Sequence, residues 1–410
     1  MDMKSNWKAY GMWLLPLLFF TGQFVLRLWP GLMMQDIMRQ FKIDAAQFGL
    51  LASAYYYGYA LMQIPIALAL DRFGARFVIS ACAMLLGAST LLFVNTQSWP
   101  LALASRFLIG AGSAAGFLGT SKIVSEWFPK AQYTHMIGLS FTVGLLGAIY
   151  GGKPTNQLIE WYGGPTVWSM IGWVTLLLGG IIFALLRRPH AIEEVDDKIQ
   201  VHDLKSALSS RHLWVLAIAN LLMVGTLEGF ADVWGVNYLM TQYHFAKNDA
   251  AQFVSCIYLG MVFGGPLLAL ISQKFGDYKT ICLCGLGMAF GLWTIIGAMI
   301  NVYVLTSLFF GLGLLCCYQV LVFSVANELA APKHLGITVA FLNCINMLGG
   351  SFFHTMIGRI MDSFWMGTLD QSARVYSSQS YQYGLSVIPM SALLGVMCVY
   401  WLQQVRKKKS

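Results

Sequence analysis

The fold of this chain is decided by one stretch of sequence, Gln63-Ile64-Pro65-Ile66-Ala67-Leu68-Ala69-Leu70-Asp71-Arg72-Phe73-Gly74-Ala75-Arg76. An apolar run ends in Asp-Arg, turns at Phe-Gly and restarts with a second arginine before the next apolar run. The same order returns in Gly265-Pro266-Leu267-Leu268-Ala269-Leu270-Ile271-Ser272-Gln273-Lys274-Phe275-Gly276-Asp277-Tyr278-Lys279, where Gly276 follows Gly74 by 202 positions. A repeat near half of the chain length indicates two copies of one membrane unit.

The composition excludes a soluble protein. The mean hydropathy is +0.63, 57% of the residues are hydrophobic and only 11% are charged, whereas soluble domains carry about 25% charged residues. The basic residues behind the net charge of +8 are scattered between apolar runs, which does not suggest a nucleic-acid partner. All eight cysteines fall inside apolar runs, so the sequence implies neither a disulfide framework nor a metal site.

Twelve apolar runs, each of roughly 20 residues, would fill most of the chain. Each is expected to be a helix, because a span must satisfy its own backbone hydrogen bonds inside lipid. The predicted spans are residues 11–35, 46–69, 76–95, 99–124, 133–155, 165–187, 212–236, 249–272, 279–299, 302–326, 335–361 and 383–404. The predicted fold is therefore an all-α membrane protein, with twelve transmembrane helices in two pseudo-symmetric six-helix bundles at 1–188 and 212–410. A polar cytoplasmic linker is expected at 189–211.

Lysine and arginine are unevenly distributed between the loops. If the N-terminus is inside, the cytoplasmic loops hold most of the basic residues, and the clear exceptions on the outer side are Arg39, Lys42, Lys247 and Arg374. Because cytoplasmic loops of membrane proteins are enriched in lysine and arginine, both termini are predicted to be cytoplasmic. Met1 to Lys8 reads as a short basic lead without a cleavable-signal pattern. The expected location is a bacterial inner (cytoplasmic) membrane.

A second short repeat marks the start of the second helix in each half. Asp44-Ala45-Ala46-Gln47-Phe48 returns as Asp249-Ala250-Ala251-Gln252-Phe253. Aspartate is a favoured N-cap residue because its carboxylate accepts a hydrogen bond from the first backbone N–H groups of a helix. Both aspartates are therefore predicted to be helix N-caps.

The opening stretch resembles a motif of the major facilitator superfamily, G-x-x-x-D-R-x-G-R-R, in the inner loop between the second and third helices. The chain keeps Asp71, Arg72, Gly74 and Arg76 and departs at Ala67 and Ala75. The fourth span is also similar to the superfamily, because Arg106 precedes the spaced glycines Gly110 and Gly112. The resemblance covers the whole chain. It implies that Asp71, Arg72 and Arg76 form an inner-gate clasp, a conformational element and not a binding site.

Three charges inside the predicted spans are the most informative residues. Arg27 lies about two thirds of the way across the first span, where a charge costs about 2.5–3.5 kcal/mol and usually faces a cavity. It is interpreted as a cavity arginine that binds a substrate carboxylate in bidentate geometry, or alternatively as an interfacial arginine whose side chain snorkels outward. Glu228 and Asp232 are four residues apart, so both can face one side of the seventh helix.

The repeat relates these charges to one another. At an offset of 202–205 residues, Arg27 corresponds to the interval 229–232. The sequence therefore predicts an arginine and two carboxylates at similar depth across one cavity. A carboxylate in such a cavity can carry a proton; the alternative is a static charge pair with Arg27.

Other polar residues in the spans are candidates for the cavity lining. They are Arg106, Lys153, Tyr56, Gln319, Asn343, Asn346 and His354. For Arg106 the alternative is a structural pair with a carboxylate, for Lys153 a side chain that reaches the interface, and for His354 a packed polar residue. Lys122, near the cytoplasmic end of the fourth span, is expected to be structural.

A narrower resemblance rests on short segments. Besides the two loop copies and the segment around Arg27, Val233–Leu239 and Ala326–His334 resemble the phagosomal transporter family of major facilitators, found in bacteria that live inside host cells. A more distant similarity is to lysosomal dipeptide transporters of the superfamily. The resemblance implies uptake of amino acids or similar small nutrients, and some relatives are associated with carboxylate siderophores.

The predicted function is secondary active transport by alternating access, with proton-coupled uptake of a small zwitterionic or carboxylate nutrient such as an amino acid or short peptide. The sequence has no Walker A loop and no credible nucleophile–base set, so neither ATP-driven transport, an enzyme nor a cofactor is expected. The expected partners are the substrate, the coupling proton and the lipid bilayer, with no nucleic acid, and the chain is expected to be a monomer.

Three alternatives remain open. A siderophore or organic-acid transporter, in either direction, would need a second cation beside Arg27 and little contribution from the two carboxylates. A drug exporter would be expected to keep a Gly-Pro pair in the fifth helix, which Gly152-Lys153-Pro154 interrupts here. A channel or receptor-like membrane protein is the alternative outside the transporters, and the duplicated unit argues against it.

Overall fold

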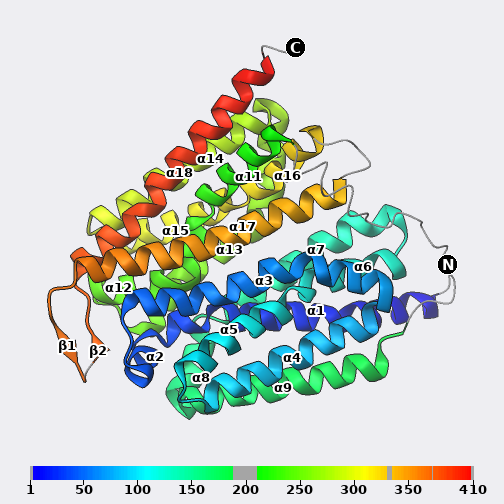
Figure 1. The fold of residues 1–410 in the computed structure, drawn as a ribbon. Helices are drawn as coiled ribbons and strands as arrows, with labels where there is room; N and C mark the ends of the chain where they lie inside the picture. The colour runs from blue at the N-terminus through cyan, green and yellow to red at the C-terminus, as the bar shows by residue number, and fades with distance from the viewer. Residues whose placement is uncertain (1–2, 188–209, 330–334, 372, 408–410) are drawn as a thin grey trace. The chain divides into compact units, whose positions relative to one another are not determined.

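The structure is a computed structural model that describes residues 3–187, 210–329, 335–371 and 373–407 (Figure 1). The described chain is helical except for its loops and one small hairpin. In this hairpin β1 (Leu369–Asp370) pairs antiparallel with β2 (Ala373–Arg374). The all-α fold class predicted from the apolar runs is confirmed.

The chain divides into two compact units. Unit 1 comprises Met1–Leu28 and Ala54–Lys198, and unit 2 comprises Trp29–Ser53 and Ile199–Ser410. The predicted bundles instead assign residues 29–53 to the first half, and their boundaries stay a prediction. The predicted linker at 189–211 lies outside the described residues except for its last two positions.

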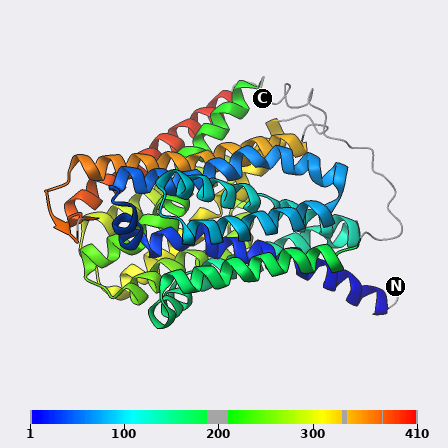
Figure 2. The same ribbon diagram turned by 60° about the horizontal axis from the view of Figure 1, so that its bottom comes forward.

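The helices of the first half of the sequence include two that the unit boundary divides. They are α1 (Met3–Leu32), α2 (Met34–Phe41), α3 (Ala45–Phe73), α4 (Ala75–Asn95), α5 (Trp99–Ser113), α6 (Ala115–Trp127), α7 (Lys130–Tyr150), α8 (Lys153–Tyr162) and α9 (Gly164–Leu185). The division falls inside α1 and α3, whose C-terminal and N-terminal parts, respectively, belong to unit 2. Within unit 1, α4 and α9 lie side by side and run antiparallel (Figure 2). The Ser80 hydroxyl donates to the carbonyl of Gly179 at 2.7 Å, and further along α4 Gly87 lies against Gly172, which comes earlier in α9.

The second half of the sequence supplies the rest of unit 2. Its helices are α11 (Arg211–Met223), the π-helix η1 (Gly225–Trp234), α12 (Gly235–Tyr243), α13 (Lys247–Phe275), α14 (Asp277–Gly297), α15 (Val302–Cys316), α16 (Tyr318–Leu329), α17 (Leu335–Ser363) and α18 (Ser378–Lys407). Residues Trp29–Ser53 of the first half also belong to this unit. The side chain of Asn237 donates to the backbone carbonyl of Gly31 in that segment at 2.7 Å. Each of the twelve predicted spans coincides with helical residues.

Ten helical segments among the described residues are long and apolar enough to cross a membrane. The two remaining predicted spans coincide with α3 and α17, each 29 residues long. These two helices carry the polar residues proposed for the cavity, such as Tyr56, Asn346 and His354, which lower their hydropathy. All three side chains are buried, as polar groups inside a membrane protein must be.

The tertiary structure confirms the sequence repeat at the turn that defined it. Gly74 precedes α4 with φ 81° and ψ 157°, and Gly276 precedes α14 with φ 83° and ψ 151°. Residues other than glycine rarely adopt this backbone conformation. The Phe-Gly turn therefore has the same geometry in both copies.

A helix crossing is repeated in the same way. In unit 1, Gly58 faces the carbonyl oxygen of Phe107 and Gly110 faces that of Tyr55; a Cβ added to either glycine would lie 2.0 or 1.9 Å from that oxygen. In unit 2, Gly260 and Gly313 occupy the equivalent places, 202 and 203 positions later, with the corresponding distances 2.2 and 1.9 Å. The duplicated glycines hold the backbones of two helices in direct contact.

We expect Gly313→Ala to lower the melting temperature of the purified protein, because the new methyl group would overlap the carbonyl of Ile257. Overpacking of this kind costs about 1–3 kcal/mol in soluble proteins. Gly311→Ala is the matched control in the same helix, since a Cβ there meets nothing within 4 Å. Equal melting temperatures for the two variants in detergent would contradict the close crossing.

The N-cap prediction is confirmed for one aspartate and wrong for the other. Asp44 accepts the backbone N–H of Gln47 at 2.9 Å, and the Gln47 amide oxygen accepts the N–H of Asp44 at 3.2 Å, a reciprocal capping box. In the second copy Ala246 is the N-cap and Asp249 lies inside the first turn. There the helix starts earlier, and the aspartate complements the helix dipole instead.

Candidate functional site

Arg27 lies in α1 and is buried, with 8% of its surface exposed. Its guanidinium carbon is 5.2 Å from the centre of the Tyr56 ring on α3 and 5.9 Å from that of Phe24. An arginine over aromatic faces gains a cation–π attraction, which holds its planar guanidinium in place. The structure therefore brings together two of the predicted site residues, Arg27 and Tyr56.

Arg106 of α5 belongs to the same group of side chains in unit 1. It is 1% exposed, donates to the carbonyl oxygen of Leu26 at 2.9 Å, and lies 5.1 Å from the centre of the Tyr55 ring. The rings of Tyr55 and Tyr56 are 5.4 Å apart in an edge-to-face arrangement, and the Tyr55 hydroxyl donates to Gln23 at 2.7 Å. Two guanidinium groups thus contact two adjacent tyrosine rings.

The predicted carboxylates lie on η1 in unit 2. Glu228 and Asp232 are 1% and 3% exposed. The N–H of Gly235 bonds the carbonyl of Phe230, five residues back, which is the π-helical pattern. Glycines permit this wide turn to pack closely, since a Cβ on Gly225 would lie 2.6 Å from the ring of Phe353.

The two carboxylates have different partners within unit 2. The Tyr258 hydroxyl of α13 donates to Asp232 at 2.6 Å. The Asn346 amide of α17 donates to Glu228 at 3.2 Å. A phenol and a carboxamide stabilise a carboxylate to different degrees, so the two acids are not chemically equivalent.

Tyr258 is a residue that the sequence reading missed, although the repeat contains the signal. It follows Tyr56 by 202 positions, and Asp232 follows Arg27 by 205. Unit 1 therefore pairs a cation with a tyrosine where unit 2 pairs a carboxylate with the equivalent tyrosine. Aligning the repeat through the aromatic residues, and not only through the charges, would have found it.

The remaining predicted site residues lie at separate places. Asn343 is half-buried and His354 is fully buried, both on α17, and Gln319 is half-buried at the start of α16. Lys153 begins α8, directly after the break between α7 and α8 at Gly151 and Gly152, and is half-buried.

The residues of the predicted inner-gate clasp lie at one end of unit 1. The Asp71 carboxylate accepts from the Lys122 ammonium at 2.9 Å, and Lys122 is also 3.9 Å from Glu126. Arg76 donates to the carbonyl of Phe183 at 2.6 Å with its guanidinium 4.8 Å from that ring, and Arg72 lies over Phe73. The sequence reading had not connected Lys122 with Asp71.

We expect Asp71→Asn to slow transport about two- to fivefold, the effect of losing one partly exposed ion pair. Ligand affinity should change little, because the ion pair with Lys122 joins the ends of α3 and α6 and includes none of the residues proposed to bind substrate. Glu126→Gln is the control, since it alters the longer contact to the same lysine. A large loss of ligand binding by folded Asp71→Asn would show that the gate assignment is wrong.

Comparisons with known proteins identify the family of the chain. The transporter YybO of Bacillus subtilis (strain 168), described as uncharacterised, is 24% identical over 359 residues, which cover 80% of this chain and 81% of that protein. GudP of the same organism, described as a probable galactarate/D-glucarate transporter, is 22% identical over 272 residues, 58% of this chain and 60% of its own.

A solved structure shows the same fold. It is a bacterial homologue of the human lysosomal transporter Spinster in an inward-facing, unoccupied conformation, with a TM-score of 0.72 at 17% identity, covering 96% of this chain and 95% of the other. The profile of the Major Facilitator Superfamily matches residues 12–354. The protein is thus a membrane transporter and not an enzyme, and this chain belongs to the Major Facilitator Superfamily.

Proposed function

We propose that this protein is a secondary transporter of a small organic carboxylate, coupled to protons. The observation that carries the proposal is the pair of buried arginines, Arg27 and Arg106, against the adjacent rings of Tyr56 and Tyr55. A carrier of organic acids needs a second cation beside Arg27, and Arg106 supplies it within the same unit; the two acids of η1 then serve the proton and not the substrate.

The chemistry of arginine favours this class of substrate. A guanidinium group can donate two parallel hydrogen bonds to one carboxylate and stays protonated throughout the cycle. The tyrosine ring fixes the plane of the Arg27 guanidinium, which reduces the conformational freedom lost on binding. Galactarate and D-glucarate, which GudP of Bacillus subtilis is described as probably transporting, are carboxylates of the same chemical class.

The carboxylates of η1 are proposed to carry the coupling proton. Arginine cannot release a proton at physiological pH, whereas a buried carboxylate can exchange one. Substrate binding and proton binding at Glu228 or Asp232 would then favour each other, and this coupling acts equally in both directions. The hydrogen bonds from Asn346 and Tyr258 position these two acids for that step.

A zwitterionic nutrient is the second candidate, because Glu228 and Asp232 could also bind an amine. Two fully buried acids on one π-helical segment favour it. It would agree with the narrower resemblance to the phagosomal nutrient transporters. Siderophore transport remains a form of the carboxylate proposal, since such ligands present several carboxylates.

A thermal-shift screen of the purified protein distinguishes these candidates, because a ligand that binds only the folded state raises its melting temperature. The screen compares D-glucarate, galactarate and succinate with amino acids and dipeptides. We expect the carboxylates without an amine to give the larger shifts. Shifts confined to amino acids or dipeptides would favour the zwitterion, and counterflow in proteoliposomes would then exclude a channel, which gives none.

The proposed location is a bacterial inner membrane with both termini cytoplasmic, as the distribution of lysine and arginine indicates. A single cysteine introduced by Ser410→Cys tests the orientation. It should resist an impermeant thiol reagent in intact cells and react after permeabilisation. Reaction in intact cells would overturn the assignment.

A further inference from the structure

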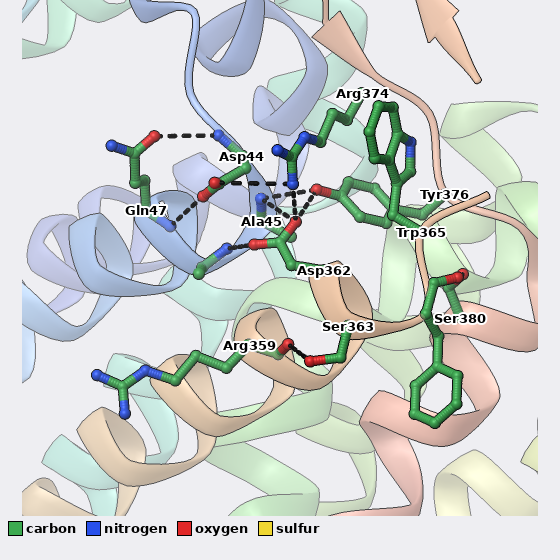
Figure 3. Close-up of polar contacts among 12 residues, drawn as sticks. Asp44, Ala45, Gln47, Arg359, Asp362, Ser363, Trp365, Arg374, Tyr376 and Ser380 are labelled. Carbon is green, nitrogen blue, oxygen red and sulfur yellow. Dashed lines mark hydrogen bonds and ion pairs between the residues drawn. The ribbon is translucent and has the colours of Figure 1, made fainter. Parts of the chain in front are cut away.

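One carboxylate in unit 2 receives four hydrogen-bond donors (Figure 3). Asp362, in the last turn of α17, accepts from the backbone N–H groups of Ala46 at 2.7 Å and Ala45 at 3.3 Å. It also accepts from Arg374 at 3.1 Å and from the Tyr376 hydroxyl. An acid in the last turn of a helix is opposed by the helix dipole, so these donors offset an unfavourable position.

The donors are the positive end of another helix. Ala45 and Ala46 are the first residues of α3, and the N–H of Ala45 also donates to the Tyr376 hydroxyl at 2.9 Å. Asp44 caps the same helix end and lies 3.8 Å from Arg374. Asp362, Arg374, Tyr376 and these two backbone N–H groups are named the Asp362 latch here.

The phenol in the latch remains a donor. Burial and the hydrogen bond to Asp362 raise the pKa of Tyr376 above its ordinary value, with the N–H of Ala45 acting in the opposite direction. Tyr376 therefore stays protonated over the physiological pH range and keeps donating its hydrogen bond to Asp362. The guanidinium of Arg374 stacks 4.5 Å from the Trp365 ring, which fixes its direction.

Beyond the latch, α3 and α17 touch along a seam of small residues. A Cβ on Gly358 would lie 2.2 Å from the carbonyl of Ala45, and one on Gly49 would lie 2.2 Å from that of His354. The Ser53 hydroxyl bonds the carbonyl of Ser351 and the hydroxyl of Thr355, each at 2.9 Å. The groups in this seam are backbone carbonyls, hydroxyls and charges, which water can solvate when they separate.

The position of the seam in the sequence gives it a mechanical meaning. Residues 44–53 belong to the first sequence repeat and residues 351–376 to the second. In transporters built from two repeats, alternating access moves one repeat against the other. A contact between the repeats at one end therefore has to break whenever that end opens.

We propose that the Asp362 latch, with the seam from Gly49 to Ser53, is a reversible closure that opens once in each transport cycle. It is at the end that carries Arg39, Lys42 and Arg374, which the distribution of charges assigns to the outer side. The latch rests on membership of the transporter superfamily and on these contacts, and not on the identity of the substrate. Failure of the carboxylate proposal would leave it standing.

The experiment measures how fast a buried thiol at the seam is labelled. Ser53→Cys is nearly isosteric and places a thiol at a fully buried position. Purified protein in lipid nanodiscs is treated with a polar maleimide, and peptide mapping separates this introduced seam thiol from the eight native cysteines. We expect Asp362→Asn to speed the labelling of the seam thiol about tenfold, since a hydrogen-bonded charge is lost from the closed state only.

Two controls make the result specific. Ser80→Cys reports a buried position bonded to Gly179 in unit 1, so its labelling should be unchanged by Asp362→Asn. Glu160→Gln removes the same charge from α8, where Glu160 accepts from Asn156 of the same helix and lies within the first repeat, and should leave labelling of the seam thiol unchanged. Unchanged labelling of the seam thiol in Asp362→Asn would overturn the latch. Equal acceleration at position 80, or by Glu160→Gln, would also overturn it, since general loosening or the change in net charge would then explain the effect.

Discussion

Arg27→Gln is expected to raise the dissociation constant of the transported carboxylate at least about 30-fold, because loss of a buried charged partner costs about 2–5 kcal/mol. The substitution removes the guanidinium that lies over the rings of Tyr56 and Phe24. Binding is measured by calorimetry on purified protein, with the carboxylate that gives the largest thermal shift.

Arg27→Lys separates charge from geometry. Lysine keeps the positive charge but lacks the planar fork that binds both carboxylate oxygens, so we expect an intermediate loss of about tenfold. Arg72→Gln is the matched control in unit 1, because Arg72 is exposed at the gate and lies over Phe73. If the folded Arg27→Gln variant bound the carboxylate with wild-type affinity, Arg27 would not be part of the binding site.

Neutralising the acids of η1 is expected to uncouple transport from the proton gradient. Asp232→Asn, Glu228→Gln or the double variant should lose uptake driven by a pH gradient and keep part of the counterflow at equal pH. With one proton per substrate, a gradient of one pH unit supports about tenfold accumulation, since tenfold corresponds to about 1.4 kcal/mol. In an uncoupled variant, the substrate concentration inside the vesicles should rise no higher than the concentration outside.

The partners of the two acids provide the controls for this experiment. Tyr258→Phe removes the hydroxyl that donates to Asp232, and we expect it to move the pH profile of uptake. Tyr238→Phe removes an equally buried hydroxyl that donates to the carbonyl of Ile295 and should leave the profile unchanged. If neither carboxylate variant, nor the double, changes the dependence on the gradient, the coupling lies elsewhere. His354 is then the next residue to test.

Several predicted features depend on local properties of the chain, which explains why the sequence was sufficient for them. Apolar runs of bilayer length must be helical in lipid, and all twelve coincide with helices here. The turns at Gly74 and Gly276 need a backbone conformation that glycine adopts, so their spacing reported the duplication directly.

Local sequence patterns were less reliable for short elements and for the exact residue at which a helix begins. The helix α2 was not predicted, because its eight residues are too few to show a span. The hairpin formed by β1 and β2 was missed for the same reason. The identical pentapeptides at Asp44 and Asp249 gave different helix starts, since the residues before them decide where the helix can begin.

By itself, the sequence determined that this is a duplicated helical membrane protein, and it singled out Arg27, Glu228 and Asp232, because charge in an apolar span is visible in one dimension. Only the tertiary structure decided the partners of those charges: Tyr56 for Arg27, Asn346 for Glu228 and Tyr258 for Asp232. It also brought the end of α17 onto the start of α3, more than 300 residues away along the chain. Such contacts depend on how helices pack, which is fixed by the shapes of many distant side chains at once and not by any local pattern.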